Sequence, residues 1–424
     1  MEYSSYTEIL RQELIPAMGC TEPISLAYAA AECRMLLGSV PEKTIAECSG
    51  NIIKNVMGVT IPNTGGMKGI EAAIASGIVI GDSSKGLEIL SAMDARLLDC
   101  VRRYREEYPI EVRLLDTDSP LHFIITMFAG VEQARVELAD THMNIVRKER
   151  NGHVVYSANR SKDSAECVLS DIPQMSIDEI IGYSETVSLE TIIPILKSQL
   201  ELNSRICSSG LESSWGAGIG KLILKSEEKS LLSRMKAYAA SGSDARMSGC
   251  VSPVVINSGS GNQGITVSMP VKVFAEDRGY SEELLIRALA ISNLVAIYEK
   301  RKIGRLSAFC GAVNAASGVS AAITWLDTRD NEKIKAAISN TLAIASGIIC
   351  DGAKPSCAAK ISIAVESAYL GFLMASCGDS FHPDEGIVKA DIEKTIDGVA
   401  EIARDGMKET DVEILKVMLD KSSR

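Results

Sequence analysis

The sequence is poor in aromatic side chains and in histidine. Phe, Trp and Tyr make up 4% of the 424 residues, and there are four histidines. The core must therefore be built from Ala, Ile, Leu, Val and Met, and small side chains of this kind favour closely packed helices. With 46% hydrophobic and 23% charged residues, the composition is that of a globular protein and excludes a disordered chain.

The sequence also lacks an excess of basic residues. Lys and Arg number 44 against 55 Asp and Glu, which gives a formal net charge of −11. Proteins that bind nucleic acid or anionic membranes carry a basic patch, so neither is expected as a partner. No basic segment followed by an apolar run opens the chain, so no signal peptide is predicted and we expect a cytoplasmic protein.

Long apolar runs are scarce as well. The longest uncharged stretch, Leu306–Leu326, has the length of a membrane span, but it is rich in Ala, Ser and Gly and contains Asn314. Membrane spans are richer in large apolar residues. We therefore predict a buried, closely packed helix here.

The eleven cysteines do not form a familiar framework. No CxxC pair occurs, and the histidines form no HExxH motif. In a cytoplasmic protein such cysteines are thiols rather than disulfides. A zinc site of familiar ligand spacing is therefore not expected.

The periodicity of the sequence changes twice along the chain. It is helical at both ends and alternating in the middle, where Asn151-Gly152 gives a hairpin signal. The predicted strands are 111–115, 123–128, 134–139, 144–148 and 154–156. We predict an α+β fold, in which residues 1–95 and 205–424 form a mainly helical body and residues 95–205 form an inserted α/β lobe.

A thiol lies in the polar turn Gly19-Cys20-Thr21-Glu22-Pro23, between two helical runs. Most cysteines in such places are small buried hydrophobes. A thiol at a helix N-terminus, however, has a lowered pKa and serves as a base, a nucleophile or a metal ligand. The residues alone leave both interpretations open for Cys20.

Three further cysteines lie in glycine-containing loops. Cys310 precedes Gly311, whereas Cys350 and Cys357 bracket a short turn. Such a turn can fold around a metal cluster, and three thiolates on a 4Fe–4S cluster leave one iron open as a Lewis acid. Spacing alone is weak evidence for a cluster site, because three cysteines among eleven often fall at ligand-like spacings by chance.

The segment Gly259–Gly264 reads GSGNQG and matches GxGxxG. A dinucleotide site needs a helix that begins inside the motif, within a βαβ unit. The following residues, Ile265–Val273, read as β-rich, and no parallel-sheet pattern surrounds them. The sequence favours a backbone nest for a carboxylate over a dinucleotide site.

One histidine, His142, follows Asp140-Thr141 at a predicted strand end. A histidine in such a place is more often a satisfied turn residue than a catalytic one.

Five segments taken in order resemble the family of serine dehydratase α-chains and L-cysteine desulfidases. They are AMGCTEP at 17–23, PNTGGMKG at 62–69, NSGSGNQG at 257–264, CGAVNAASG at 310–318 and CDGAKPSC at 350–357. The resemblance covers nearly the whole chain, and the short 350–357 loop is more similar to the desulfidase branch.

The resemblance implies an oxygen-sensitive 4Fe–4S cluster with three ligands, Cys310, Cys350 and Cys357, and one open iron. Cys20 is then either the catalytic base, which we favour, or a ligand in place of Cys357; in the second case His142 becomes the candidate base. The expected substrate-binding residues are Asn63, Thr64, Lys68, His142, Ser258, Gly259, Ser260, Gly261 and Asn262.

The expected function is the β-elimination of a small amino acid, L-cysteine, to pyruvate, ammonia and hydrogen sulfide. One alternative is the dehydration of L-serine with the same cluster. A second alternative is that the protein is a non-catalytic iron–sulfur redox sensor. A homodimer is the candidate assembly of the chain with itself. The amino-acid substrate is the expected small-molecule partner.

Overall fold

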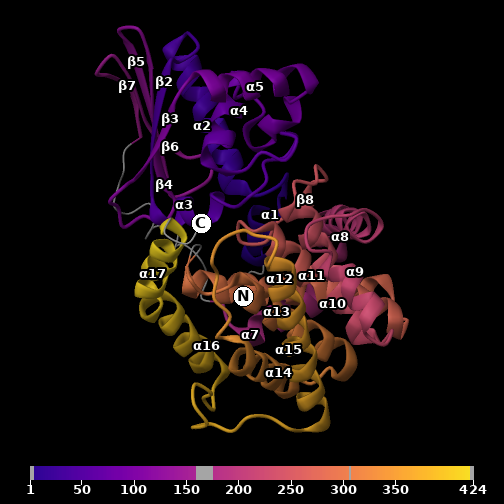
Figure 1. Ribbon diagram of the computed structural model, residues 1–424. Helices are drawn as coiled ribbons and strands as arrows, with labels where there is room; N and C mark the ends of the chain where they lie inside the picture. The colour runs from indigo at the N-terminus through magenta and orange to yellow at the C-terminus, as the bar shows by residue number, and fades with distance from the viewer. Residues whose placement is uncertain (1–3, 159–174, 305–306, 421–424) are drawn as a thin grey trace.

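The computed structural model describes residues 4–158, 175–304 and 307–420. A six-stranded sheet with its covering helices forms one part, and a bundle of helices forms the other (Figure 1). The predicted α+β fold is confirmed.

The sheet has the strand order β3-β2-β4-β5-β6-β7. β2 pairs in parallel with β3, and the other neighbours are antiparallel. The hairpin between β6 and β7 turns at Asn151 and Gly152, whose φ angles of 51° and 80° confirm the predicted turn. The strands are β2 Lys43–Cys48, β3 Ile110–Leu114, β4 His122–Ala129, β5 Glu132–Ala139, β6 Ile145–Arg150 and β7 His153–Ser157.

Helices cover the sheet on one side. α2 contacts β4 and β5 and packs against α4, which in turn contacts α5. The contact between α2 and α4 is close, because a side chain at Gly77 would overlap the backbone of Ala27. The helical segments of this part are α2 Thr21–Leu37, α3 Gly50–Val56, α4 Gly69–Ile80, η1 Gly86–Ala92 and α5 Ala95–Glu107.

The helical part is built around α13, whose residues from Ala312 to Leu326 are buried. α13 contacts α11, α12, α14 and α15, which confirms the predicted buried helix; Leu306 lies outside the described residues. The remaining elements are α1 Ser4–Glu13, β1 Pro16–Ala17, α7 Ile177–Thr186, α8 Leu189–Glu212, α9 Ile219–Ser226, α10 Leu231–Met247, β8 Val254–Val255, α11 Gly261–Arg278, α12 Glu282–Ile303, α13 Gly311–Thr328, α14 Asn331–Ala345, α15 Cys357–Cys377, α16 Ile392–Glu401, η2 Ile402–Gly406 and α17 Lys408–Leu419.

The two larger hydrophobic cores divide the chain into two parts, and the boundaries between them do not lie at the predicted residues 95 and 205. One core contains buried side chains from Ile24 to Ile145, and the other contains buried side chains up to Ala17 and from Met175 onward. Residues 18–95 therefore belong to the sheet part, where β2 supplies an interior strand. The sequence did not reveal β2, because its buried positions are Thr44, Ala46 and Cys48, small side chains that resemble those of the neighbouring Ala-rich helices.

The predicted β-rich segment 265–273 is a helix. α11 runs through it from Gly261 to Arg278, with Pro270 inside. Tertiary burial overrides the local preference of its β-branched residues for strand. The helix does begin inside the GxGxxG motif, but the preceding strand, β8, pairs antiparallel with β1, so the motif is not part of a βαβ unit.

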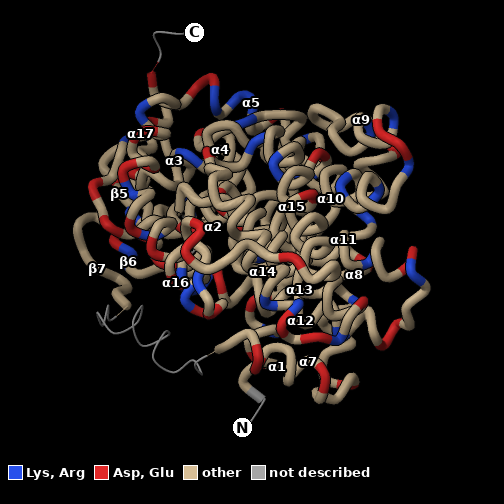
Figure 2. The backbone as a smooth tube through the Cα atoms, turned by 90° about the horizontal axis from the view of Figure 1, so that it is seen from below, with Lys and Arg blue, Asp and Glu red and all other residues tan. Residues whose placement is uncertain are grey.

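Charged residues lie mainly around the outside of the molecule. Basic and acidic segments alternate there, and uncharged stretches run through the middle (Figure 2). One helix in the described part, α15, is long and apolar enough to cross a membrane by length and composition, and half of its most apolar window is buried. It packs against α10, α13 and α14, as core helices of globular proteins do.

Gly77 provides a test of the packing between α2 and α4. Gly77→Ala should lower the free energy of unfolding by about 1–3 kcal/mol, because the added methyl group meets the Ala27 carbonyl. Gly398→Ala is the matched control: nothing lies within 4 Å of its added Cβ, and the change should raise stability by about 0.5–1 kcal/mol. Urea denaturation measures both, and equal effects would contradict the close approach.

Candidate active site

Two very short strands bring the N-terminal cysteine to the glycine-rich loop. Pro16 and Ala17 of β1 pair with Val255 and Val254 of β8. Cys20 follows the first strand and Ser258–Gly264 follows the second. Because the strands are antiparallel, the two segments leave the pair at opposite ends, and the chain beyond each strand brings them into contact. Thr21 donates a hydrogen bond from Oγ1 to the Gly259 carbonyl, at 3.1 Å.

A second short backbone pairing brings two loop cysteines together. Phe309 and Ile349 form an isolated β-bridge. The Cys310 N–H donates to the Ile348 carbonyl at 3.1 Å, and the Cys350 N–H donates to the Ala308 carbonyl at 2.6 Å. Cys310 and Cys350 are therefore held side by side by the main chain.

The loop between Cys350 and Cys357 packs on the sheet part. Gly352 has a φ of 92°, and a side chain there would overlap the Lys54 carbonyl in α3. Lys54 in turn forms an ion pair with Asp411 of α17. The Lys354 N–H donates to the Cys357 Sγ at 3.4 Å. The loop thus lies where the sheet part, the helical part and α17 meet.

Four helices begin at this junction. Cys20 is the N-cap of α2, Cys310 is the N-cap of α13, and Cys357 is the first residue of α15. α11 begins beside them, because a side chain at Gly311 would overlap Gln263. Helix N-termini carry partial positive charge and unpaired N–H groups. The junction therefore favours anionic groups.

The thiol of Cys20 does not have the lowered pKa predicted for a helix N-terminus. Burial raises its pKa well above the usual value, and the neighbouring Glu22 carboxylate raises it further. The thiol donates a hydrogen bond to Glu22 Oε2 at 3.1 Å. Loss of hydration and a like charge outweigh the helix end in the metal-free chain. Cys20 is therefore a protonated thiol beside a carboxylate.

The loop cysteines affect one another electrostatically. Burial raises the pKa of Cys310 to about 12, and Cys350 and Cys357 contribute to the rise. The pKa of Cys357 is raised mainly by burial and also by Cys350, whereas the Lys354 N–H lowers it. Cys357 also raises the pKa of Cys20. The four thiols therefore occupy one neighbourhood, in which thiolates form only when positive charge offsets them.

The glycine-rich loop is a tight turn that ends in a helix. Ser258 and Gly259 have positive φ angles of 50° and 79°. Ser260 caps α11 by accepting from the Gln263 N–H at 3.3 Å. The N–H groups of Gly261 and Asn262, in the first helical turn, lack intrahelical acceptors. They are the part of the predicted nest that remains suited to a carboxylate.

His142 lies against this loop. A Cβ on Gly259 would be 3.6 Å from the His142 Cε1 atom. The His142 carbonyl accepts a hydrogen bond from Ser25 Oγ at 2.6 Å, which fixes the segment to α2. The structure thus brings together Cys20, His142, the loop Ser258–Asn262 and the three loop cysteines.

The other predicted substrate-binding side chains do not join this group. Asn63 donates to the Leu90 carbonyl at 2.9 Å, and Thr64 donates to the Ile61 carbonyl at 2.7 Å. Lys68 is exposed. The loop approaches through Pro62, because a side chain at Gly19 would overlap the Pro62 ring. The 62–69 segment supports the turn before Cys20, whereas Asn63 bonds to η1, Thr64 bonds within the loop and Lys68 faces solvent.

Several polar residues at the junction were not identified from the sequence. Glu22, Gln263 and Asn314 lie inside the motif segments, so their place in those segments was the available signal. Arg246, at the end of α10, lies in no motif segment. The side chains of Gln263, Asn314 and Arg246 are at most 3% exposed, and each has a buried nitrogen without a hydrogen-bond partner among the described residues.

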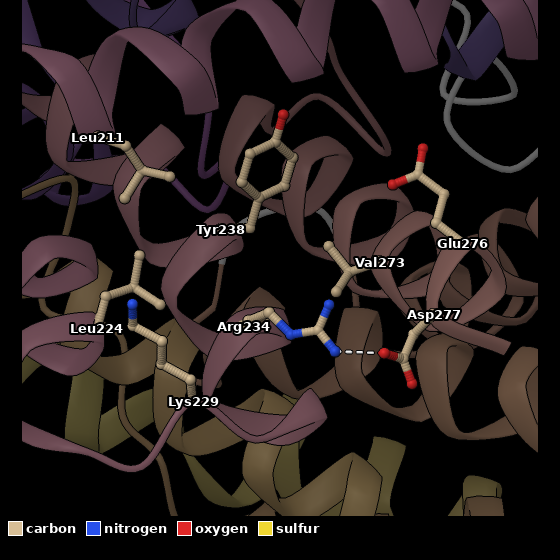
Figure 3. A pocket seen from close by; sticks show the side chains of 8 residues that line it. All are labelled: Leu211, Leu224, Lys229, Arg234, Tyr238, Val273, Glu276 and Asp277. Atoms are coloured by element: carbon tan, nitrogen blue, oxygen red, sulfur yellow. Dashed lines mark hydrogen bonds and ion pairs between the residues drawn. The ribbon is translucent and has the colours of Figure 1, made fainter.

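A cavity of about 620 Å³ lies elsewhere, among α8–α11. Tyr238 and Val273 line it together with the ion pair between Arg234 and Asp277 (Figure 3). None of the four junction thiols contributes to its lining. It is therefore a feature separate from the thiol site.

The candidate ligands at this junction are the cysteine thiols. Among the described residues, no three or more His, Cys, Asp or Glu side chains are grouped for a single metal ion. An iron–sulfur cluster distributes its thiolates around several metal atoms instead. Cys310, Cys350 and Cys357 supply soft sulfur ligands, and Cys310 and Cys357 lie at helix N-termini.

The fold and the site define an α+β protein with a thiol-rich site between two cores, and comparisons place it in a family. The family model of the serine dehydratase alpha chain matches residues 84–416. The chain therefore belongs to the serine dehydratase alpha chain family, which supports a serine dehydratase-like lyase of amino-acid breakdown.

Full-length relatives have the same extent. A UPF0597 protein of Finegoldia magna is 47% identical over 418 residues, covering 98% of this chain and 100% of that protein. A UPF0597 protein of Desulfitobacterium hafniense is 45% identical over 421 residues, covering 99% and 98%. One from Treponema denticola is 44% identical over 423 residues, covering 99% and 98%.

The contact between Cys20 and Glu22 can be tested directly. Glu22→Gln removes the negative charge beside the thiol and should lower the pKa of Cys20. At a fixed pH below the midpoint, alkylation of Cys20 should become on the order of tenfold faster, as measured by mass spectrometry of the metal-free chain. Glu8→Gln, at an exposed position on α1, is the control. Unchanged or slower alkylation in Glu22→Gln would contradict the assignment.

Proposed function

We propose that the protein is an iron–sulfur-dependent lyase that eliminates the β-substituent of L-cysteine, giving pyruvate, ammonia and hydrogen sulfide. The observation that carries the proposal is the convergence of Cys310, Cys350 and Cys357 beside Cys20 and the glycine-rich loop. Cys357 is the first residue of α15, Cys350 begins the short loop that leads to it, and Cys310 is the N-cap of α13.

A 4Fe–4S cluster suits these three residues. Their crowding and burial raise the pKa of Cys310 and Cys357, so a cationic metal group offsets an otherwise unfavourable set of thiolates. Three ligands are fewer than the four metal atoms, which leaves one iron open. When bound, such a cluster supplies a Lewis acid for the leaving group.

Cys20 and Glu22 are the residues proposed to remove the Cα proton of the substrate. Elimination requires a base for the weakly acidic Cα–H of the substrate. Cys20 is the proposed base, and Glu22 Oε2, 3.1 Å away, is the acceptor that first takes the thiol proton. Asn55 donates to the other Glu22 oxygen at 3.3 Å and holds the carboxylate in place.

The glycine-rich loop is proposed to bind the substrate. The first-turn N–H groups of α11, together with Asn262, are proposed to hold the α-carboxylate. His142, which lies against Gly259, is the proposed substrate contact from the sheet part. A soft thiolate binds iron more readily than a hydroxyl group does, which favours cysteine over serine.

L-serine dehydration is the second candidate. The family model carries the name of a serine dehydratase, and the residues proposed for proton removal and carboxylate binding serve either substrate equally. The two candidates differ only in the leaving group.

Product analysis tests the proposal. The anaerobically reconstituted chain should release sulfide and pyruvate in equal amounts from L-cysteine, with a higher kcat/KM than for pyruvate release from L-serine. Activity on L-serine alone would favour the second candidate. Reconstituted protein that is inactive on both substrates would contradict the lyase proposal.

The same assay tests Cys20. Cys20→Ala should lower kcat by on the order of 10²–10⁴, because it removes the proposed general base. Cys377→Ala, at the exposed end of α15, is the control and should keep full activity. Full activity in Cys20→Ala would mean that another residue is the base, and His142 is the next candidate.

A further inference from the structure

Arg246 is a buried cation. It lies in the last turn of α10, and 3% of its surface is exposed. Among the described residues, no Asp or Glu forms an ion pair with its guanidinium group. Burying an unpaired charge is unfavourable, so a buried arginine of this kind requires an anion from another source.

The guanidinium group lies at the start of α11. Its Nη1 donates to Asn262 Oδ1 at 3.3 Å, and its Nε–H is buried without a hydrogen-bond partner. A side chain at Gly261 would overlap the guanidinium, so glycine at this position is what allows Arg246 to approach the first turn of α11. The close approach positions a fixed positive charge beside the N–H groups of Gly261 and Asn262.

The surroundings connect this charge with the thiol site. Arg246 lowers the pKa of Cys20, whose dominant influences are burial and Glu22. Gln263, the next residue of α11, is 3% exposed, packs against Gly311 and has a buried Nε2 without a partner among the described residues. A guanidinium without an acidic partner and an amide nitrogen without a hydrogen-bond partner, both among the described residues, thus flank the helix start that lies between Cys20 and Cys310.

We infer that Arg246 binds the α-carboxylate of the amino-acid substrate, with Asn262 orienting the guanidinium and the N–H groups at the start of α11 completing the site. The inference rests on the proposed function for the substrate class and adds the residue that selects α-carboxylates. A guanidinium matches the two oxygens of a carboxylate in one plane. Arg246 therefore takes the role that the exposed Lys68 was expected to share.

The inference predicts selection by the carboxylate. L-alanine has the ammonium and carboxylate groups of the substrate but no leaving group, so it binds without reacting. Ethylamine lacks the carboxylate. Isothermal titration of the full-length chain, before and after anaerobic reconstitution, should show that the wild type binds L-alanine more tightly than ethylamine.

Arg246→Gln should weaken L-alanine binding by about 10- to 100-fold, because a charge-assisted contact is lost, and should leave ethylamine binding unchanged. Arg246→Lys, which keeps the charge, should lose less affinity. Gly261→Ala should act like Arg246→Gln, because its methyl group displaces the guanidinium. Arg205→Gln, at an exposed arginine of α8, is the matched control and should bind as the wild type does. Melting curves check that each variant is folded.

Two results would overturn the inference. The first is L-alanine binding by Arg246→Gln within about twofold of the wild type. The second is a wild type that does not prefer L-alanine to ethylamine. Failure of the proposed function is a separate outcome, because L-alanine binding requires no turnover: Arg246-dependent binding without release of pyruvate would retain the carboxylate site and reject the lyase.

Discussion

The site depends on two backbone pairings that are each only one or two residues long. β1 with β8, together with the hydrogen bond from Thr21 to Gly259, holds the Cys20 turn against the glycine-rich loop, and Phe309 with Ile349 holds Cys310 near Cys350. α2, α11 and α13 begin soon after these pairings and α15 begins after the 350–356 loop, so short stretches of main chain fix four helix N-termini at one junction. Their N–H groups and dipoles all act on the same small volume.

Burial dominates the electrostatics of this volume. The helix ends favour thiolates, yet the pKa values of Cys20, Cys310 and Cys357 are raised, because the loss of hydration and the neighbouring negative charges are larger effects. Binding of a cationic metal group would therefore be coupled to release of thiol protons. Cys20 differs from the other two in having a carboxylate, Glu22, as a hydrogen-bond acceptor for its proton.

Much of the fold and part of the site followed from the sequence. The strands from 110 to 157, the turn at Asn151-Gly152 and the buried helix α13 were predictable because their patterns are long or chemically specific. β2 was not, since its buried side chains are small and resemble those of the Ala-rich helices, and α11 was not, since its β-branched residues resemble a strand. Motif order identified the cysteines and the loop, although it also selected Asn63, which bonds to η1, and Thr64, which bonds within its own loop.

Arg246 illustrates what the sequence could not provide. It lies in no recognisable motif, and only the fold shows that it is buried, bonded to Asn262 and without an acidic partner among the described residues. The same holds for the site as a whole, because α2 and α3 come from the sheet part and α11, α13 and α15 come from the helical part. Contacts between distant segments create the site.

The iron content of single cysteine variants after anaerobic reconstitution tests the central claim most directly. The account predicts about four iron atoms per chain in the wild type, in Cys20→Ala and in Cys377→Ala, and loss of iron in Cys310→Ala, Cys350→Ala and Cys357→Ala. Iron retained by Cys357→Ala but lost from Cys20→Ala would contradict it, because Cys20 would then be the third ligand and not the base.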